Sequence, residues 1–225
     1  MEEREIAEGV EKQPYFEAVT VTEESKQDDG TREMGELYPF LISGGTNTER
    51  YYFTHINDKT DYKFNIRPRY FGDESNYTEA FPKRINEVLS ANNDAKIFCV
   101  FDWDTIYGDE AKLKKHEVFM EQIKEDISNG TVVLCPSMPS IEYWFLLHYK
   151  NTSRYYGTSQ AVIEDLKNFI PQYDKAEKFL QQEKWVVEMT GEGRLEEACA
   201  RAEALGTDGE SYSKVFEVIK VIGKN

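Results

Sequence analysis

The chain has 225 residues, of which 40% are hydrophobic and 13% aromatic, enough to build one sizeable core or, less readily, two small ones. Its net charge of −15 argues against a passive nucleic-acid coat, because phosphate binding draws on clustered Lys and Arg, but does not exclude an enzyme that meets phosphates through a bound cation. No stretch approaches ~20 apolar residues and the N-terminus is acidic, so we expect no membrane span or signal peptide, and a cytoplasmic protein.

Negative charge is concentrated at the start of the chain. Residues 1–36 contain 12 acidic and 4 basic residues and include the turn-rich segment SKQDDGTREMG. We expect an acidic N-terminal extension here, although the piece PYFEAVTVTEE could add an edge strand. The remaining residues, 37–225, are expected to form one domain.

From Tyr38 onwards, short apolar segments alternate with segments of helical periodicity. The pattern predicts strands at 38–43, 62–71, 96–101 and 131–135, helices at 49–57, 78–89, 113–127 and 141–148, and then helices at 161–170, 175–182, 195–205 and 212–222. Thr48 is a candidate N-cap of the first helix. Pro68 lacks a backbone donor and places the second strand at a sheet edge. Gly130 is expected to end the helix before the fourth strand.

Apolar strands that alternate with helices predict an α/β fold with a mainly parallel sheet flanked by helices, followed by a helical C-terminal third. Ligands of such sheets bind outside the carboxyl ends of the strands. We therefore expect ligands to bind at the loops after Ser43, Phe101 and Cys135.

Asp102 and Asp104 stand two residues apart where the third apolar strand ends. Side chains alternate along a strand, so both carboxylates can point the same way, with their Cα atoms roughly 7 Å apart. Two neighbouring acids repel unless a cation or a proton lies between them, which favours coordination of Mg²⁺ or Mn²⁺ over a simple helix cap. Lys112, Lys114 and Lys115 follow and form either a solvated helix face or contacts to phosphates.

Glu142 opens the apolar helix that follows the fourth strand. Its carboxylate either compensates the helix dipole or serves as a third metal ligand, and the sequence favours neither. His148 is read as a satisfied histidine at the edge of the core. His55 and His116 are read as surface residues.

The first loop, GGTNTE, is a weak phosphate-binding candidate. It lacks both the G-K-[ST] ending of a P-loop and the spacing of a dinucleotide-binding motif. Glu49 lies in the first turn of the following helix, where it is either a ligand or a favourable N-terminal charge.

Three blocks of this sequence resemble the RloB family, small proteins of bacterial phage-defence loci with a TOPRIM-like, Rossmann-like α/β fold. The family pattern is E-G-x-x-T-E-x-x-Y-F after the first strand, D-x-D at the end of a later strand, and S-N-P-x-F-E-x-W-x-L-L-H. The corresponding segments here are GGTNTERYYF, FDWD and SMPSIEYWFLLH, and the closing segment ARAEALGTDGESYSKVFEVIKVI is also similar. Together they span residues 38–222 in the same order.

The resemblance implies a metal-dependent nuclease core. Asp102 and Asp104 correspond to the Mg²⁺-binding carboxylates of TOPRIM domains, and Glu142 and Glu49 are further acids. Glu49, Glu142 and Asp102 are the candidate catalytic residues, and Asp102, Asp104 and Glu142 the candidate ligands of Mg²⁺ or Mn²⁺. The resemblance also implies an RloA-type ATPase partner and abortive infection through cleavage of RNA, tRNA or DNA, while a homo-oligomer stays open.

Gly44 stands where the family pattern has a strand-end glutamate. Losing such an acid removes a candidate general base, whose contribution is typically ~10²–10⁴-fold. Four explanations remain open. Glu49 or Glu142 substitutes, a partner supplies the group, this member has lost the activity, or Gly44 is an engineered change.

Three functions are therefore weighed. The first is a Mg-dependent phosphodiesterase acting on nucleic acid. The second is a catalytically degenerate TOPRIM-like subunit that binds the partner ATPase without cutting. A haloacid-dehalogenase-type phosphatase ranks third, because FDWDT places its threonine one position early for the D-x-D-x-T nucleophile motif.

Overall fold

The structure is a computed structural model that describes residues 38–45, 47–67 and 77–222. The expected acidic extension, 1–36, lies outside these residues. The strands are β1 (Phe40–Ser43), β2 (Asn65–Arg67), β3 (Ile97–Asp102), β4 (Val132–Met138) and β5 (Tyr212–Ser213). The helices are α1 (Thr48–Lys59), α2 (Tyr77–Ala91), α3 (Glu110–Gln122), α4 (Lys124–Ser128), α5 (Ile141–Leu147), α6 (Ser159–Leu166), α7 (Glu177–Leu180), α8 (Lys184–Thr190), α9 (Arg194–Leu205) and α10 (Phe216–Ile222), with a 3₁₀ turn η1 (Trp103–Thr105).

The strands form one sheet in the order β2-β1-β3-β4-β5. The pairs among β1 to β4 are parallel, and β5 runs antiparallel to β4. The expected α/β fold with a mainly parallel sheet is confirmed, and so is the edge position of β2. Because the chain steps from β1 outward to β2 and then back to β3 on the other side, the boundary between β1 and β3 is the topological switch point where such sheets bind ligands.

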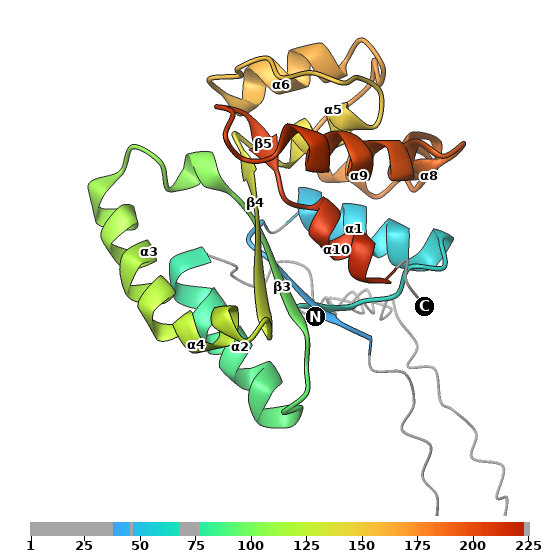
Figure 1. Ribbon diagram of the computed structural model, residues 1–225. Helices are drawn as coiled ribbons and strands as arrows, with labels where there is room; N and C mark the ends of the chain where they lie inside the picture. Colours follow the sequence, from blue (N-terminus) through green and yellow to red (C-terminus); the bar gives the residue numbers. More distant parts are fainter. Residues whose placement is uncertain (1–37, 46, 68–76, 223–225) are drawn as a thin grey trace, which may run out of the picture. The chain divides into compact units, whose positions relative to one another are not determined.

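Side chains alternate along the strands and build one core on each face of the sheet. Leu41, Phe98 and Val100 belong to the core shared with α1, α5 and the C-terminal helices. Ile42 and Cys99 belong to the core shared with α2 and α3. Figure 1 shows these two groups of helices on opposite sides of β3 and β4.

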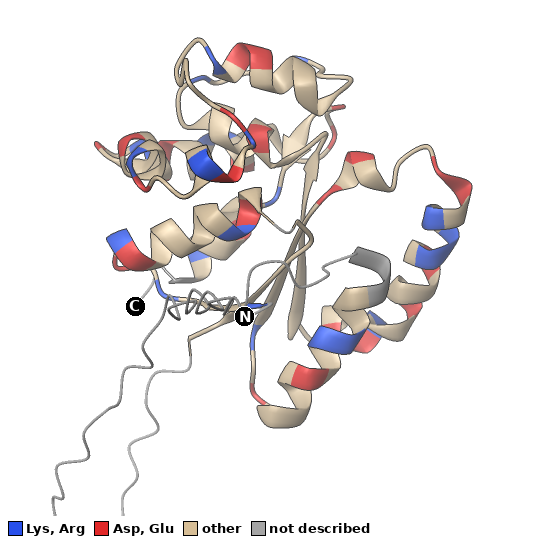
Figure 2. Ribbon diagram, turned by 180° about the vertical axis from the view of Figure 1, so that it is seen from behind, with Lys and Arg blue, Asp and Glu red and all other residues tan. Residues whose placement is uncertain are grey.

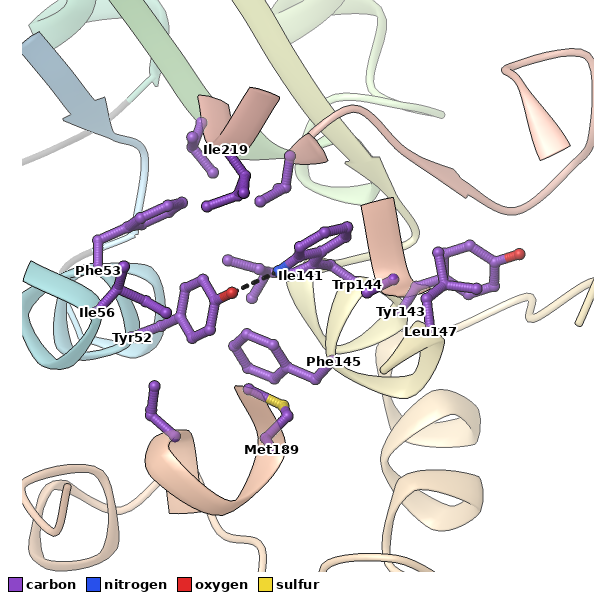
Figure 3. Close-up of a cluster of buried hydrophobic side chains, with 14 of the residues drawn as sticks. Tyr52, Phe53, Ile56, Ile141, Tyr143, Trp144, Phe145, Leu147, Met189 and Ile219 are labelled. Carbon is purple, nitrogen blue, oxygen red and sulfur yellow. Dashed lines mark hydrogen bonds between the residues drawn. The ribbon is translucent and has the colours of Figure 1, made fainter. Parts of the chain in front are cut away.

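The larger core is aromatic and centres on the contact between α1 and α5 (Figure 3). Tyr52 and Trp144 are fully buried, and the indole Nε1 of Trp144 donates a hydrogen bond to the hydroxyl of Tyr52 (2.8 Å). Phe145 packs against Tyr52 with ring centroids 5.0 Å apart. This neutral, satisfied pair fixes the two helices whose first turns carry Glu49 and Glu142.

Several predicted boundaries were wrong. The helix α1 begins at Thr48, so its N-cap is Asn47 and not Thr48. The helix expected over 113–127 is divided at Ile123, which leaves helical geometry between α3 and α4. The helix α8 was not predicted.

The segments around the fourth strand also differ from expectation. The strand β4 continues through Pro136 to Met138, and the carbonyl of Pro136 accepts the backbone N–H of Lys214 (2.9 Å). The helix expected over 212–222 starts only at Phe216, because Tyr212 and Ser213 pair with the open edge of β4. Backbone pairing therefore outweighs the local helical pattern there.

His55 and His116 are not the surface residues that the sequence predicts. His55 is buried, and its Nε2 lies 2.8 Å from the carbonyl oxygen of Leu180. His116 is partly buried against Trp103, with ring centroids 4.9 Å apart.

Candidate active site

Three acids gather at the carboxyl edge of the sheet beside the switch point. Glu49 belongs to the first turn of α1, which follows β1, and Asp102 is the last residue of β3. Glu142 belongs to the first turn of α5, which follows β4. Each helix thus starts where its strand ends, and the parallel register brings these ends to one edge. The negative charges of Glu49 and Glu142 both act on Asp102, and that of Glu142 acts on Glu49, as expected for neighbouring acids.

Asp102 projects on the same face of β3 as Phe98 and Val100, toward α1 and α5. Its Oδ1 accepts the backbone N–H of Ile141 (2.8 Å), which ties the end of β3 to the start of α5. Burial raises the pKa of Asp102 well above its ordinary value, and the negative charges of Glu49 and Glu142 raise it further. Asp102 therefore lies in a site with more negative charge than its surroundings neutralise.

Asp104 is held differently from Asp102. The strand ends at Asp102 and Asp104 lies in η1, so the expectation that strand alternation aligns the two carboxylates was wrong. Its backbone N–H instead donates to the carbonyl of Pro139 (3.2 Å). Burial raises the pKa of Asp104, although Lys175 counteracts this. Asp104 is a partly buried acid at the margin of the cluster.

Glu49 is only 4% exposed. Burial raises its pKa from 4.5 to about 7, with Glu142 adding to the shift and Lys175 opposing it. Its carboxylate lies over Gly45, because a Cβ added to that glycine would fall 1.9 Å from Oε2 of Glu49. The glycine thus leaves the space that the carboxylate occupies.

Glu142 is fully buried and accepts hydrogen bonds on both oxygens. Ser140 Oγ donates to Oε2 (2.6 Å) and Tyr173 Oη donates to Oε1 (2.8 Å). Lys175 Nζ lies 2.9 Å from the same Oε1. Tyr173 and Lys175 come from the loop between α6 and α7, which sequence reasoning missed because no motif or periodicity links that loop to Glu142.

Gly44 has no room for a side chain. Its backbone N–H donates to the carbonyl of Val100 (2.7 Å), which continues the pairing of β1 with β3. A Cβ at this position would lie 2.8 Å from Cβ and 3.2 Å from Cα of Phe101. Contacts under 3.0 Å require the backbone to shift, so an acid at position 44 does not fit the present spacing of β1 and β3.

Lys112 and His148 each contact a backbone carbonyl. Lys112 Nζ donates to the carbonyl of Thr105 (2.8 Å) and thereby closes η1 onto α3. His148 is buried, and its Nδ1 lies 3.0 Å from the carbonyl oxygen of Trp144. Its buried Nε2 has no hydrogen-bond partner among the described residues, so the expectation of a satisfied histidine was wrong for this nitrogen. Burial lowers the pKa of His148 to about 3. It is therefore a neutral residue of the core near neutral pH.

The donor set suits a hard divalent cation, because carboxylate oxygens are its preferred ligands and three buried acids raise one another's energy when ionised. The present side-chain arrangement is not a coordination shell. Among the described residues, no group of three or more His, Cys, Asp or Glu is placed to hold a metal ion. The charge next to Glu142 is the ammonium group of Lys175 instead.

Comparisons with known proteins give one result. A family model described as RloB-like protein matches residues 40–222, which include β1, every acid discussed above and α10. Searches of the curated proteins and of the solved structures found no match. Within the described part of the chain, no helix has both the length and the apolar character needed to cross a membrane.

Proposed function

This chain belongs to the RloB-like protein family, and we propose that it is a metal-dependent phosphodiesterase that cleaves nucleic acid. The observation that carries the proposal is the convergence of Glu49, Asp102 and Glu142 at the switch point, where burial and neighbouring negative charge raise the pKa values of Glu49 and Asp102. Such a cluster costs folding free energy, and functional sites are where proteins retain this kind of cost.

Mg²⁺ or Mn²⁺ would be held by Asp102, Asp104 and Glu142. When bound, the cation supplies charge neutralisation and Lewis-acid activation at a phosphoryl oxygen. Asp102 is already oriented by the N–H of Ile141, and Glu142 by Ser140 and Tyr173. The two ligands are thus fixed by groups that do not themselves react.

Glu49 is the proposed general base. Its pKa of about 7 is close to the pH at which it would act, so its carboxylate can both take up and release a proton. Glu49 would also substitute for the strand-end glutamate of the family pattern, in whose place this chain has Gly44. Because position 44 has no space for a side chain, Glu49 over Gly45 is the acid available on the β1 side of the site.

Nuclease activity is tested by incubating the chain with RNA, tRNA and DNA in Mg²⁺, Mn²⁺ or a chelator. We expect cleavage of at least one substrate that requires the cation and that Asp102→Asn abolishes. The matched control is Asp165→Asn, which changes a partly buried carboxylate of α6 that has no role in the proposed site. This variant should cleave like the parent. Cleavage that survives in the chelator, or in Asp102→Asn, contradicts the proposal.

The proposed setting is phage defence by abortive infection with an RloA-type ATPase as partner, as membership of the family suggests. The nuclease assay should therefore be repeated with the ATPase and ATP present. Activity that appears only in the mixture would assign the partner a role in activating this chain.

A second candidate is a degenerate subunit that binds the ATPase without cutting. The observations in its favour are Gly44, which excludes a side chain, and the absence of a formed metal group among the described residues. Calorimetric titration with Mn²⁺ separates the two candidates. Binding that an Asp102→Ala/Asp104→Ala variant loses supports the phosphodiesterase, whereas no binding either to the parent or to a Lys175→Met variant supports the degenerate subunit.

A further inference from the structure

We propose that Lys175 is a built-in counter-ion of the carboxylate cluster, and that a divalent cation enters the site by displacing its ammonium group from Glu142. The inference rests on the metal site proposed above, and it identifies the group on this chain that the metal must replace. It assigns Lys175 the role of controlling metal affinity.

The contacts of Glu142 show that its Oε1 is already occupied by two donors. Its Oε1 is bound by both Tyr173 Oη (2.8 Å) and Lys175 Nζ (2.9 Å), and its Oε2 is bound by Ser140 Oγ (2.6 Å). A carboxylate oxygen has two lone pairs, so Oε1 has no lone pair left for a metal. Oε2 keeps one lone pair, so it is binding of a metal through Oε1, or through both oxygens, that requires a donor to withdraw from Oε1.

Lys175 is the donor that can withdraw. Ser140 is 0% exposed and Tyr173 is 1% exposed, with its ring packed against Phe145 and Trp185. The side chain of Lys175 is 44% exposed, and four flexible methylene groups carry its ammonium. It can turn into solvent without disturbing the core, while Ser140 and Tyr173 keep Glu142 in position.

The charge of Lys175 acts on the whole cluster. Burial raises the pKa values of Glu49, Asp102 and Asp104, and the positive charge of Lys175 opposes the rise in each case. The ammonium therefore provides the neutralisation that a divalent cation would provide. The ammonium and a divalent cation would neutralise the same carboxylates and repel each other at short range, so binding of the metal disfavours the contact between Lys175 and Glu142.

The chain offers a matched control for this lysine. Lys150 Nζ lies 3.0 Å from Oδ2 of Asp165, and its side chain is 40% exposed. Its geometry and exposure nearly equal those of Lys175, but Asp165 is not part of the proposed site. Replacing each lysine by methionine removes the charge and keeps most of the aliphatic stem.

The first experiment is calorimetric titration of Mn²⁺ into the full chain and into Lys175→Met, Lys150→Met and Lys175→Met/Asp102→Asn, at one pH and ionic strength. We expect Lys175→Met to bind Mn²⁺ at least about tenfold more tightly than the parent, because a repelling charge is gone. Lys150→Met should bind like the parent, and the double variant should lose the gain.

The outcomes separate this inference from the proposed function. Parent binding that Lys175→Met leaves equal or weakens overturns the role of Lys175 alone. No binding by any chain overturns the metal site, and the counter-ion role with it. Equal gains in Lys150→Met and Lys175→Met would reveal a general charge effect and would also overturn the inference.

A second measurement uses the unmodified chain and so does not depend on the folding of a variant. Amine-selective labelling of Lys175 is followed by mass spectrometry with and without Mn²⁺, with Lys150 as internal reference. Displacement predicts faster labelling of Lys175 in Mn²⁺ and unchanged labelling of Lys150. Unchanged or slower labelling of Lys175 at a saturating Mn²⁺ concentration overturns the proposal.

Discussion

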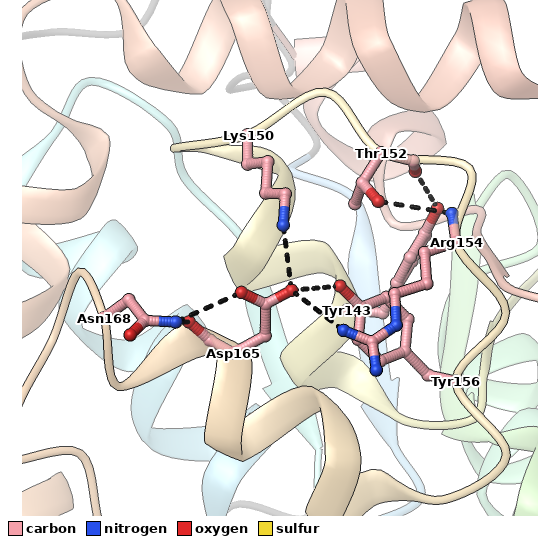
Figure 4. Close-up of polar contacts among 7 residues, drawn as sticks. All are labelled: Tyr143, Lys150, Thr152, Arg154, Tyr156, Asp165 and Asn168. Carbon is pink, nitrogen blue, oxygen red and sulfur yellow. Dashed lines mark hydrogen bonds and ion pairs between the residues drawn. The ribbon is translucent and has the colours of Figure 1, made fainter.

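Asp165 and Glu142 are both acids bound by a lysine and a tyrosine, but they differ in the charge of their surroundings. Asp165 receives Lys150 and Tyr156, together with the amide of Asn168 (Figure 4). The hydrogen bond from Tyr156 is the main cause of its lowered pKa. Around Glu142 the neighbours include Glu49 and Asp102, whose pKa values are raised.

The difference distinguishes Asp165, whose contacts join two segments of the fold, from Glu142, for which we propose a functional role. Around Asp165 the donors outnumber the acids, so its ionised form is stabilised and joins α6 to the loop after α5. Around Glu142 several acids share Lys175, and the ionised forms of Glu49 and Asp102 are disfavoured. Such an excess of negative charge favours the binding of a further cation or of a proton. Charged side chains of both signs also lie along α3 (Figure 2). The ion pair of Lys112 with Asp109, just before this helix, is exposed and contributes little to stability.

The largest expected effect is on catalysis. If Glu49 is the general base, Glu49→Gln should reduce the rate of nucleic-acid cleavage by about 10²–10⁴-fold, while Asp165→Asn should leave it unchanged. Mn²⁺ binding, measured by calorimetry, should persist in Glu49→Gln. A rate within a few-fold of the parent would remove Glu49 from the proposed mechanism.

The second effect is on the pH dependence of stability, with opposite signs in the two regions. Folding raises the pKa of Glu49 from 4.5 to about 7, so between these values the folded chain holds a proton that the unfolded chain releases. The free energy of unfolding should therefore fall as the pH rises through this window, by up to ~1.4 kcal/mol per pH unit for one proton. The raised pKa of Asp102 acts in the same direction.

Asp165 should behave in reverse. Folding lowers its pKa from 3.8, so its contribution to stability is present above 3.8 and is lost as the pH falls through the lower, folded value. Urea unfolding from pH 3 to pH 8 in chelator tests both signs. Glu49→Gln should reduce the slope between pH 4.5 and 7, and Asp165→Asn should reduce only the acid-side slope. A neutral-range slope that Glu49→Gln leaves intact would contradict the assignment.

A smaller effect is expected at the two glycines beneath the acidic cluster. A Cβ at Gly44 would press on the backbone of Phe101, so Gly44→Ala should reduce the free energy of unfolding by about 1–3 kcal/mol. At Gly45 the three atoms nearest to an added Cβ all belong to the carboxyl end of the Glu49 side chain and not to backbone. Gly45→Ala should therefore cost less stability but shift the pKa of Glu49, which the same urea series reports. Equal losses in both variants would contradict this distinction.

The sequence was sufficient to predict the sheet and the acids at its strand ends. It was insufficient to predict which side chains neutralise those acids. Continuous apolar runs predicted β1, β3 and β4, and the strand-end rule then brought Asp102 and Glu142 to one edge. The contacts of Tyr173 and Lys175 with Glu142 could not be predicted, because they cross about 30 residues of chain. The periodicity instead placed Lys175 at the start of a helix over 175–182, whereas α7 begins only at Glu177. The position of Asp104 was missed because the strand ends two residues earlier. How far the negative charge of the acids is neutralised depends on such contacts between segments distant in the sequence.

The smallest effect is expected at Lys150. Its ion pair with Asp165 is substantially exposed, so Lys150→Met should change the free energy of unfolding by no more than about 1 kcal/mol. Tyr156 and Asn168 still donate to Asp165 in that variant, and no second acid is left without a partner. Lys175→Met, by contrast, removes the cation that several acids share, so its loss of stability in chelator should be larger and should be recovered on adding Mn²⁺. Urea unfolding of both variants with and without Mn²⁺ makes the comparison, and equal losses that Mn²⁺ does not affect would mean that the two carboxylates differ in surroundings but not in function.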